Sequence, residues 1–294
     1  MVPYYIFSLF SMLVFWGLSH FVKMDGELSF PDCLLTMLYG NSRPDQMKWN
    51  TPLWFLPCLF GVLLCVYGIE KAIFLIKKSN NKLQICIRVM CVLLFLTLGI
   101  VLERTVDIRL PFQMESGVFM IGFCELGILL KLFIQRFEKI KHKTVFSIVI
   151  ITVSMAAGVL LSILNGFAEV RIMSYGAYPV LFILTSVLFS ISFIFVSILL
   201  DRGKLLKLVG QNTMVILVLH KFPVMFFQVM CSYTKDWLKD SGALGICVAL
   251  LLSIVIVIIC YFISMFINRF LLFLLGKSYQ RSKSKPDGSE SKTE

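Results

Sequence analysis

Long apolar runs, separated by short polar connections, dominate the hydrophobic pattern of the chain. A helix needs roughly 20 apolar residues to cross about 30 Å of hydrocarbon. The runs do not alternate with a period of two, as barrel strands do, and an unbroken apolar run in lipid favours a helix because a helix satisfies its own backbone. The pattern predicts an all-α integral membrane protein, a bundle of about eight transmembrane helices over residues 3–22, 52–76, 85–102, 115–134, 144–164, 179–200, 209–230 and 244–268.

Basic residues in the connections predict the orientation of these helices. Connections that hold the larger share of Lys and Arg are expected on the cytoplasmic side of a membrane. These are residues 77–84, 135–143, 201–208 and the C-terminal tail. The alternate connections are expected to face outward, namely residues 23–51, 103–114, 165–178 and 231–243. The pattern therefore places both ends of the chain in the cytoplasm.

Composition agrees with a membrane environment. Apolar residues make up 58% of the chain, against about 45–50% in soluble domains. The net charge of +11 would suggest nucleic acid on a soluble protein, but here the basic residues lie between spans, which favours membrane lipid as partner and no nucleic acid. Residues 1–275 are expected to form one membrane domain and residues 276–294 a disordered basic cytoplasmic tail. The nine cysteines lack CxxC spacing, so no metal site is predicted.

Two ionisable residues fall near the middle of predicted spans. Glu125 and His220 lie at similar depth when residues are counted from the span ends. A charged group there costs about 2.5–3.5 kcal/mol on insertion scales, so each requires a reason. One interpretation is a shared polar cavity, in which both are candidate catalytic residues. The other is a structural hydrogen bond or ion pair between helices.

The predicted outward connections contain side chains that suit a sugar-binding site. Glu169 and Arg171 lie in one of them, and Trp54 lies at the outer end of the second span. Carboxylate and guanidinium groups form paired hydrogen bonds with hydroxyls, and an aromatic ring offers an apolar face. The alternative is an ordinary interfacial tryptophan beside solvated loop charges.

Five segments together resemble a known family. They are Pro3-Tyr4-Tyr5-Ile6-Phe7-Ser8-Leu9, Thr51-Pro52-Leu53-Trp54-Phe55-Leu56, Leu110-Pro111-Phe112 with Glu115, Asn165-Gly166 with Tyr175-Gly176, and Val209-Gly210-Gln211-Asn212-Thr213 with Leu219-His220. In this order they resemble the membrane-bound O-acyltransferases of acyltransferase family three, and within it the fucose O-acetylase-like branch.

The resemblance implies O-acetylation of a cell-surface polysaccharide or sugar, in a cell membrane of the bacterial inner or plasma type. It implies acetyl-CoA as co-substrate, with no bound cofactor, and cytoplasmic Lys204 and Lys207 as residues that attract its phosphates. The implied substrate-binding residues are Trp54, Asn165, Glu169, Arg171, Asn212 and His220.

One departure from the family pattern affects the catalytic assignment. The family ordinarily has ten spans, with a catalytic His in the first, and Pro3 aligns near its third span. The resemblance therefore implies that the first two family spans are missing from this sequence, that the catalytic residue is unknown, and that this chain alone is inactive. Two other interpretations stay open: a transporter or flippase of lipid-linked glycan, and a non-enzymatic assembly protein.

Overall fold

The described part of the chain is almost entirely helical. The computed structural model describes residues 1–19, 29–42, 47, 49–75, 81–105, 109–137, 143–200, 203–230 and 242–270. Within these ranges the only strand-type pairing is an isolated bridge between Glu169 and Ser174. The predicted all-α class is therefore confirmed. The predicted tail, residues 276–294, lies outside the described residues.

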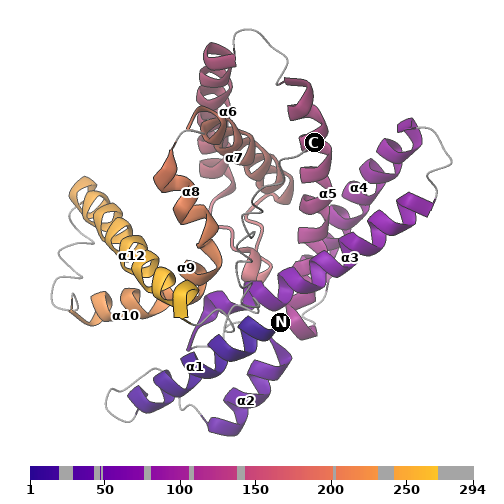
Figure 1. Cartoon of the computed structure of the whole chain (residues 1–294). Helices are drawn as coiled ribbons and strands as arrows, with labels where there is room; N and C mark the ends of the chain where they lie inside the picture. Colours follow the sequence, from indigo (N-terminus) through magenta and orange to yellow (C-terminus); the bar gives the residue numbers. More distant parts are fainter. Residues whose placement is uncertain are drawn as a thin grey trace, which may run out of the picture.

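Figure 1 labels the helices of the described residues. They are α1 (Val2–Ser19), α2 (Phe30–Tyr39), α3 (Phe55–Leu75), α4 (Asn81–Thr105), α5 (Met114–Phe137), α6 (Lys143–Asn165), α7 (Pro179–Leu199), α8 (Lys204–Gln211), α9 (Thr213–Leu219), α10 (Lys221–Met230) and α12 (Ala243–Phe270). Three single turns of 3₁₀-helix cover Thr51–Trp54, Pro111–Gln113 and Val170–Ile172.

Most predicted spans correspond to single helices. Five segments of the described chain are long and apolar enough to cross a membrane: Thr51–Leu75, Lys82–Thr105, Thr144–Asn165, Pro179–Leu199 and Leu244–Arg269. The apolar part of α1 is shorter. Helix α5 has 24 residues, and at about 1.5 Å per residue it also has the length to cross the hydrocarbon.

The predicted span 209–230 is not one helix, and this corrects the sequence-based prediction. The chain forms α8, α9 and α10 there, with breaks at Asn212 and His220. The Asn212 side chain donates to the Leu208 carbonyl at 2.7 Å, a local bond that competes with the helix. Pro223 has no N–H to donate to the Leu219 carbonyl, so the helix restarts rather than continues.

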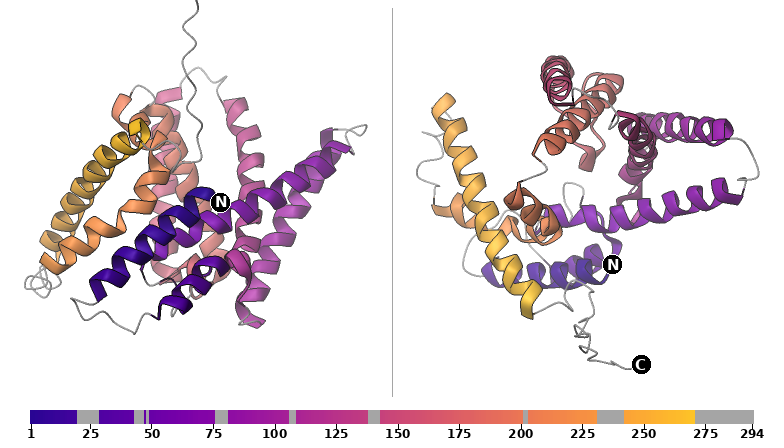
Figure 2. Two further views of the ribbon diagram at one scale, coloured as in Figure 1. Left: turned by 60° about the horizontal axis from the view of Figure 1, so that its bottom comes forward. Right: turned by 45° about the horizontal axis from the view of Figure 1, so that its top comes forward.

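The predicted outward connection 23–51 contains a helix, α2, that the apolar pattern did not predict. Pro31 occupies its first turn, and Gly40, with φ of +69°, ends it, which is the usual placement of these two residues. Helix α2 packs against α1, as Figure 2 shows. The Tyr4 hydroxyl donates to the Met37 carbonyl at 2.7 Å, so the end of α2 lies beside the start of α1.

The remaining helices each pack against one or two neighbours. Helix α6 lies against α7, and α5 lies against both α4 and α3 (Figures 1 and 2). At Gly99 of α4 a Cβ atom would lie only 2.6 Å from the Phe119 ring of α5. Small residues allow such close helix approach in membranes. Helix α12 packs against α9 and α10.

The turn between α6 and α7 is held by the amide of Asn165. Its Nδ2 donates to the Tyr175 carbonyl at 2.9 Å, and its Oδ1 accepts the Tyr178 N–H at 2.9 Å. The buried Tyr175 ring stacks on Phe119 at 4.1 Å between centroids. Gly176 has φ of +85°, and a Cβ there would lie 2.2 Å from Asn165 Nδ2. The turn therefore requires glycine and links α7 to α5.

Substitution of this glycine tests the turn. Gly176→Ala should lower the free energy of unfolding by about 1–3 kcal/mol because the left-handed backbone is strained for alanine. Gly68→Ala in α3 is the matched control, since its Cβ would meet nothing within 4 Å. Thermal unfolding in detergent measures both variants, and equal melting temperatures would contradict this account of the turn.

Candidate functional site

A pocket of about 500 Å³, lined by both polar and apolar side chains, lies where three segments distant in sequence meet. They are the start of α3, the loop after α6 and the junction of α9 with α10. Its lining residues are Thr51, Pro52, Trp54, Phe55, Glu169, Val170, Arg171, Leu217 and His220. We call this the loop pocket. It contains four residues that were singled out from the sequence: Trp54, Glu169, Arg171 and His220.

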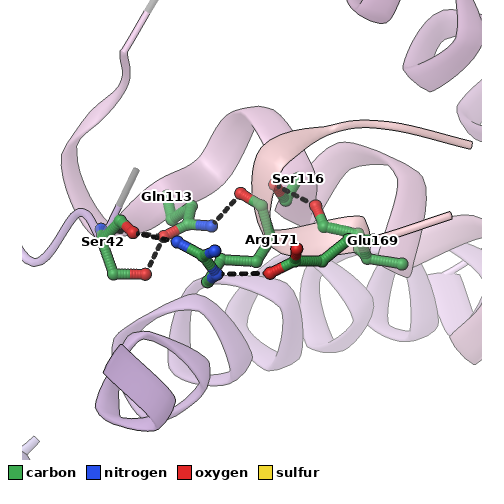
Figure 3. A network of polar contacts seen from close by, with 6 residues as sticks. Ser42, Gln113, Ser116, Glu169 and Arg171 are labelled. Carbon is green, nitrogen blue, oxygen red and sulfur yellow. Dashed lines mark hydrogen bonds and ion pairs between the residues drawn. The ribbon is translucent and has the colours of Figure 1, made fainter. Parts of the chain in front are cut away.

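Arg171 is held by two fixed hydrogen bonds. Its Nε donates to Glu169 Oε1 at 2.6 Å, and its Nη1 donates to the Ser42 carbonyl at 2.7 Å (Figure 3). The backbone of the loop is closed by paired bonds between Glu169 and Ser174, at 2.7 and 3.1 Å. These bonds hold the Glu169 and Arg171 side chains in fixed positions at the pocket. The hydrogen bond between the two is charge-assisted and therefore stronger than a neutral one.

Gln113 joins this loop to the segment after α2. Its buried Oε1 accepts from both the N–H and the hydroxyl of Ser42, at 3.0 and 3.1 Å. Its Nε2 donates to the Arg171 carbonyl at 2.6 Å (Figure 3). Gln113 and Phe112 both have positive φ, 53° and 59°, a strained geometry for non-glycine residues. The sequence did not single out Gln113, although a polar amide after Leu110-Pro111-Phe112 is an available signal.

His220 lines the loop pocket, and one of its ring nitrogens contacts backbone carbonyl oxygens. Its Nδ1 lies 2.8 Å from the Leu217 carbonyl oxygen and 3.2 Å from that of Ile216. Because carbonyl oxygens only accept hydrogen bonds, these contacts assign the proton to Nδ1 in the neutral ring. The lone pair then resides on Nε2, which is able to accept a proton from a hydroxyl.

Trp54 lies in a turn at the edge of the pocket, and Asn50 joins this turn to α9 by a hydrogen bond. The Asn50 amide donates to the Ser11 hydroxyl and to the Val218 carbonyl, each at 3.0 Å. Leu53 is fully buried in the same turn. The start of α3 is thereby tied to α1 and α9, and Trp54 and His220 line the same pocket.

The two predicted asparagines lie outside the loop pocket. Asn165 holds the α6–α7 turn. Asn212 accepts from Ser264 Oγ and Asn268 Nδ2, both at 2.7 Å, and lines a separate pocket of about 650 Å³ between α8 and α12. Both amides therefore join parts of the fold, and their role in substrate binding stays a prediction.

Glu125 does not line the loop pocket with His220. Its carboxylate is buried and accepts from Arg88 Nη1 at 2.9 Å, while Arg88 also pairs with Glu70 at 2.6 Å. This matches the alternative of an ion pair between helices, here α3, α4 and α5. Within the described ranges no group of three His, Cys, Asp or Glu residues is placed to hold a metal ion.

The Gln113 bridge is tested by removing its amide. Gln113→Ala leaves the Ser42 N–H and the Arg171 carbonyl without their partner, at a cost of about 1–3 kcal/mol for each buried group. Gln84→Ala on α4 is the control, because Gln84 is only half-buried. Thermal unfolding in one detergent compares the two, and an unchanged melting temperature for Gln113→Ala would argue against the bridge.

The ion pair between α4 and α5 is tested with a double substitution. Arg88→Met leaves the Glu125 carboxylate buried without its cation, which should destabilise the chain by about 3–5 kcal/mol. Adding Glu125→Gln removes the unpaired charge and should recover most of that loss. A double variant no more stable than Arg88→Met would show that the pair does not act as a unit.

Comparison with known proteins agrees with this architecture. A family model of the acyltransferase domain of acyltransferase family 3 matches residues 2–265. No curated protein and no solved structure matches the chain. The match covers nearly the whole chain, and several apolar helices accompany it. The chain belongs to acyltransferase family 3 and is a multi-pass membrane acyltransferase.

Proposed function

We propose that this acyltransferase transfers acetyl from acetyl-CoA to a sugar hydroxyl of a cell-surface polysaccharide at the bacterial plasma membrane. The observation that carries the proposal is the loop pocket, which gathers Trp54, Glu169, Arg171 and His220 around about 500 Å³. A concave site with a few fixed polar groups and one aromatic face suits a sugar ring.

The reaction requires a base beside the attacking hydroxyl. The sugar oxygen attacks the thioester carbonyl carbon, its proton passes to the base, and the carbon–sulfur bond breaks. The CoA thiolate leaves and takes up a proton. Among the described residues of the loop pocket, His220 is the candidate base, because its Nδ1 contacts with carbonyl oxygens keep Nε2 available.

The pocket between α8 and α12 is a candidate binding site for the donor, acetyl-CoA. It lies between α8 and α12 and includes Gln211, Asn212, Asn268 and Arg269. Amide and guanidinium groups bind phosphate and carbonyl oxygens, and Lys207 lies on the same short helix, α8. Helices α8 and α9 then run from this pocket to His220, so one broken segment connects the proposed donor and acceptor sites.

Gene deletion in the natural host tests the proposal with the protein in its own membrane. Deletion should remove O-acetyl groups from the surface polysaccharide while the amount of polysaccharide stays the same. The intact gene should restore them, and His220→Ala should restore about 1% or less, given the roughly 10²–10⁴-fold contribution of a positioned base. Proton NMR of the purified polysaccharide measures acetyl groups per repeat.

Ser253→Ala is the control variant, since this exposed serine donates to the Ala249 carbonyl of its own helix, α12, and it should restore full acetylation. Immunoblotting of membranes checks that all variants accumulate equally. Unchanged acetylation after deletion would refute the proposal. Loss of the whole polysaccharide from the surface would point instead to transport or assembly.

A further inference from the structure

The Arg171 guanidinium has more hydrogen-bond donors than the fold uses. A guanidinium carries five N–H groups in a fixed plane. Its Nε donates to Glu169 Oε1 at 2.6 Å, and its Nη1 donates to the Ser42 carbonyl at 2.7 Å (Figure 3). Within the described part of the chain Nη2 has no hydrogen-bond partner and is not buried. Because Arg171 lines the loop pocket, the two N–H groups of Nη2 are available to a ligand there.

The backbone that carries this guanidinium is held at two successive carbonyl groups. Ser116 Oγ donates to the Val170 carbonyl at 2.9 Å, and Gln113 Nε2 donates to the Arg171 carbonyl at 2.6 Å. Ser116 lies in the first turn of α5, and Gln113 lies in the 3₁₀ turn before it. The position of the guanidinium is therefore set before a substrate arrives. Donors that are fixed in advance need no reorganisation when charge develops on a bound atom.

The charges of the loop pocket suit an anion that forms during a reaction. Among the described residues that line it, Glu169 and Arg171 are the only ones with a permanent charge, and Glu169 already accepts from Arg171 Nε. His220 lines the same pocket, with Nδ1 on the Leu217 carbonyl and Nε2 left as the acceptor. A base and a cationic donor from two separate segments therefore line one pocket.

Resting on the function proposed above, we infer that Arg171 is a catalytic residue whose Nη2 donates to the carbonyl oxygen of the thioester. The sugar oxygen bonds to the carbonyl carbon, and its proton passes to His220 Nε2. The carbonyl π electrons move to the oxygen, which becomes an oxyanion that accepts from Nη2. When the C=O bond forms again, the carbon–sulfur bond breaks, and the CoA thiolate takes up the proton from His220. Arg171 keeps all of its protons throughout.

The infrared spectrum of bound acetyl-CoA tests this role directly. The full chain is placed in phosphatidylcholine nanodiscs with acetyl-CoA, either unlabelled or with ¹³C at the thioester carbonyl, and the difference spectrum isolates that carbonyl. No sugar is present, so the acetyl group stays on CoA. The bound carbonyl should stretch at a lower wavenumber than that of free acetyl-CoA, because a charge-assisted hydrogen bond to the oxygen weakens the C=O bond.

Substitution of Arg171 locates the donor. Arg171→Met should return the stretch to its position in free acetyl-CoA. Arg171→Lys should keep about half of the shift or less, because one ammonium nitrogen cannot serve Glu169, the Ser42 carbonyl and the thioester together. His220→Ala should keep the whole shift, as should the matched control Arg109→Met, since Arg109 is exposed and does not line the pocket. An unshifted carbonyl in the unaltered chain, a shift that survives Arg171→Met, or no bound acetyl-CoA would overturn the inference.

The rate of transfer gives a second measurement, which a purely structural role of Arg171 would not change in the same way. Membranes of the deletion host that carry each variant receive radioactive acetyl-CoA, and the initial rate is divided by the amount of chain on an immunoblot. Arg171→Met should lower the maximal rate about 10²–10³-fold, while the KM for acetyl-CoA changes less than about threefold. A higher KM with an unchanged maximal rate would limit Arg171 to substrate binding and would overturn the inference.

The infrared measurement contains no acceptor, so it is independent of the proposed sugar substrate. A shifted carbonyl, together with a polysaccharide that keeps its acetyl groups after gene deletion, would refute the proposed acceptor alone. Loss of acetylation after deletion together with an unshifted carbonyl would refute the role of Arg171 alone.

Discussion

Buried backbone groups outside helices need hydrogen-bond partners, and at one end of this helix bundle Gln113 supplies them. Its amide has both an acceptor and donors, so it satisfies Ser42 and the Arg171 carbonyl at once. Neither a carboxylate nor an ammonium group offers both. The strained backbone at Gln113, with φ of 53°, is stabilised by these bonds. Without them the segments around Ser42 and Arg171 would keep their direct Arg171–Ser42 hydrogen bond but lose their attachment to the turn before α5.

The loop pocket follows from this attachment and two others. Asn50 ties the turn that carries Trp54 to the Val218 carbonyl of α9. The break between α9 and α10 orients His220, whose Nδ1 contacts backbone carbonyls. The Gln113 bridge fixes the loop that carries the Glu169–Arg171 ion pair. Together the three attachments bring this ion pair, the Trp54 ring and the His220 imidazole to one pocket. Each comes from a different segment, so the site exists only in the folded chain.

Local sequence chemistry predicted the helices and several pocket residues, and tertiary structure decided the rest. Apolar runs identify spans because lipid forces the backbone into helices. They do not reveal the break at His220, because the predicted apolar run extends from residue 209 to residue 230, although Pro223 within it is a signal that the sequence does contain. Asn165 and Glu125 were chosen for their polarity, but whether a polar group serves a ligand or a neighbouring helix depends on contacts distant in sequence. Gln113 was missed for the same reason, because its partners lie about 60 or more residues away along the chain.

The most direct measurement of the central claim observes Trp54 while a sugar binds. The chain contains four tryptophans, and 5-fluorotryptophan labelling gives each its own ¹⁹F resonance, with that of Trp54 assigned by its loss in Trp54→Phe. Titration with glucose and, in a separate sample, with glucuronate should shift the Trp54 resonance with at least one of them and leave that of Trp16, on the exposed face of α1, in place. An unchanged Trp54 resonance at saturating sugar, or equal shifts of both, would contradict a sugar-binding site in the loop pocket.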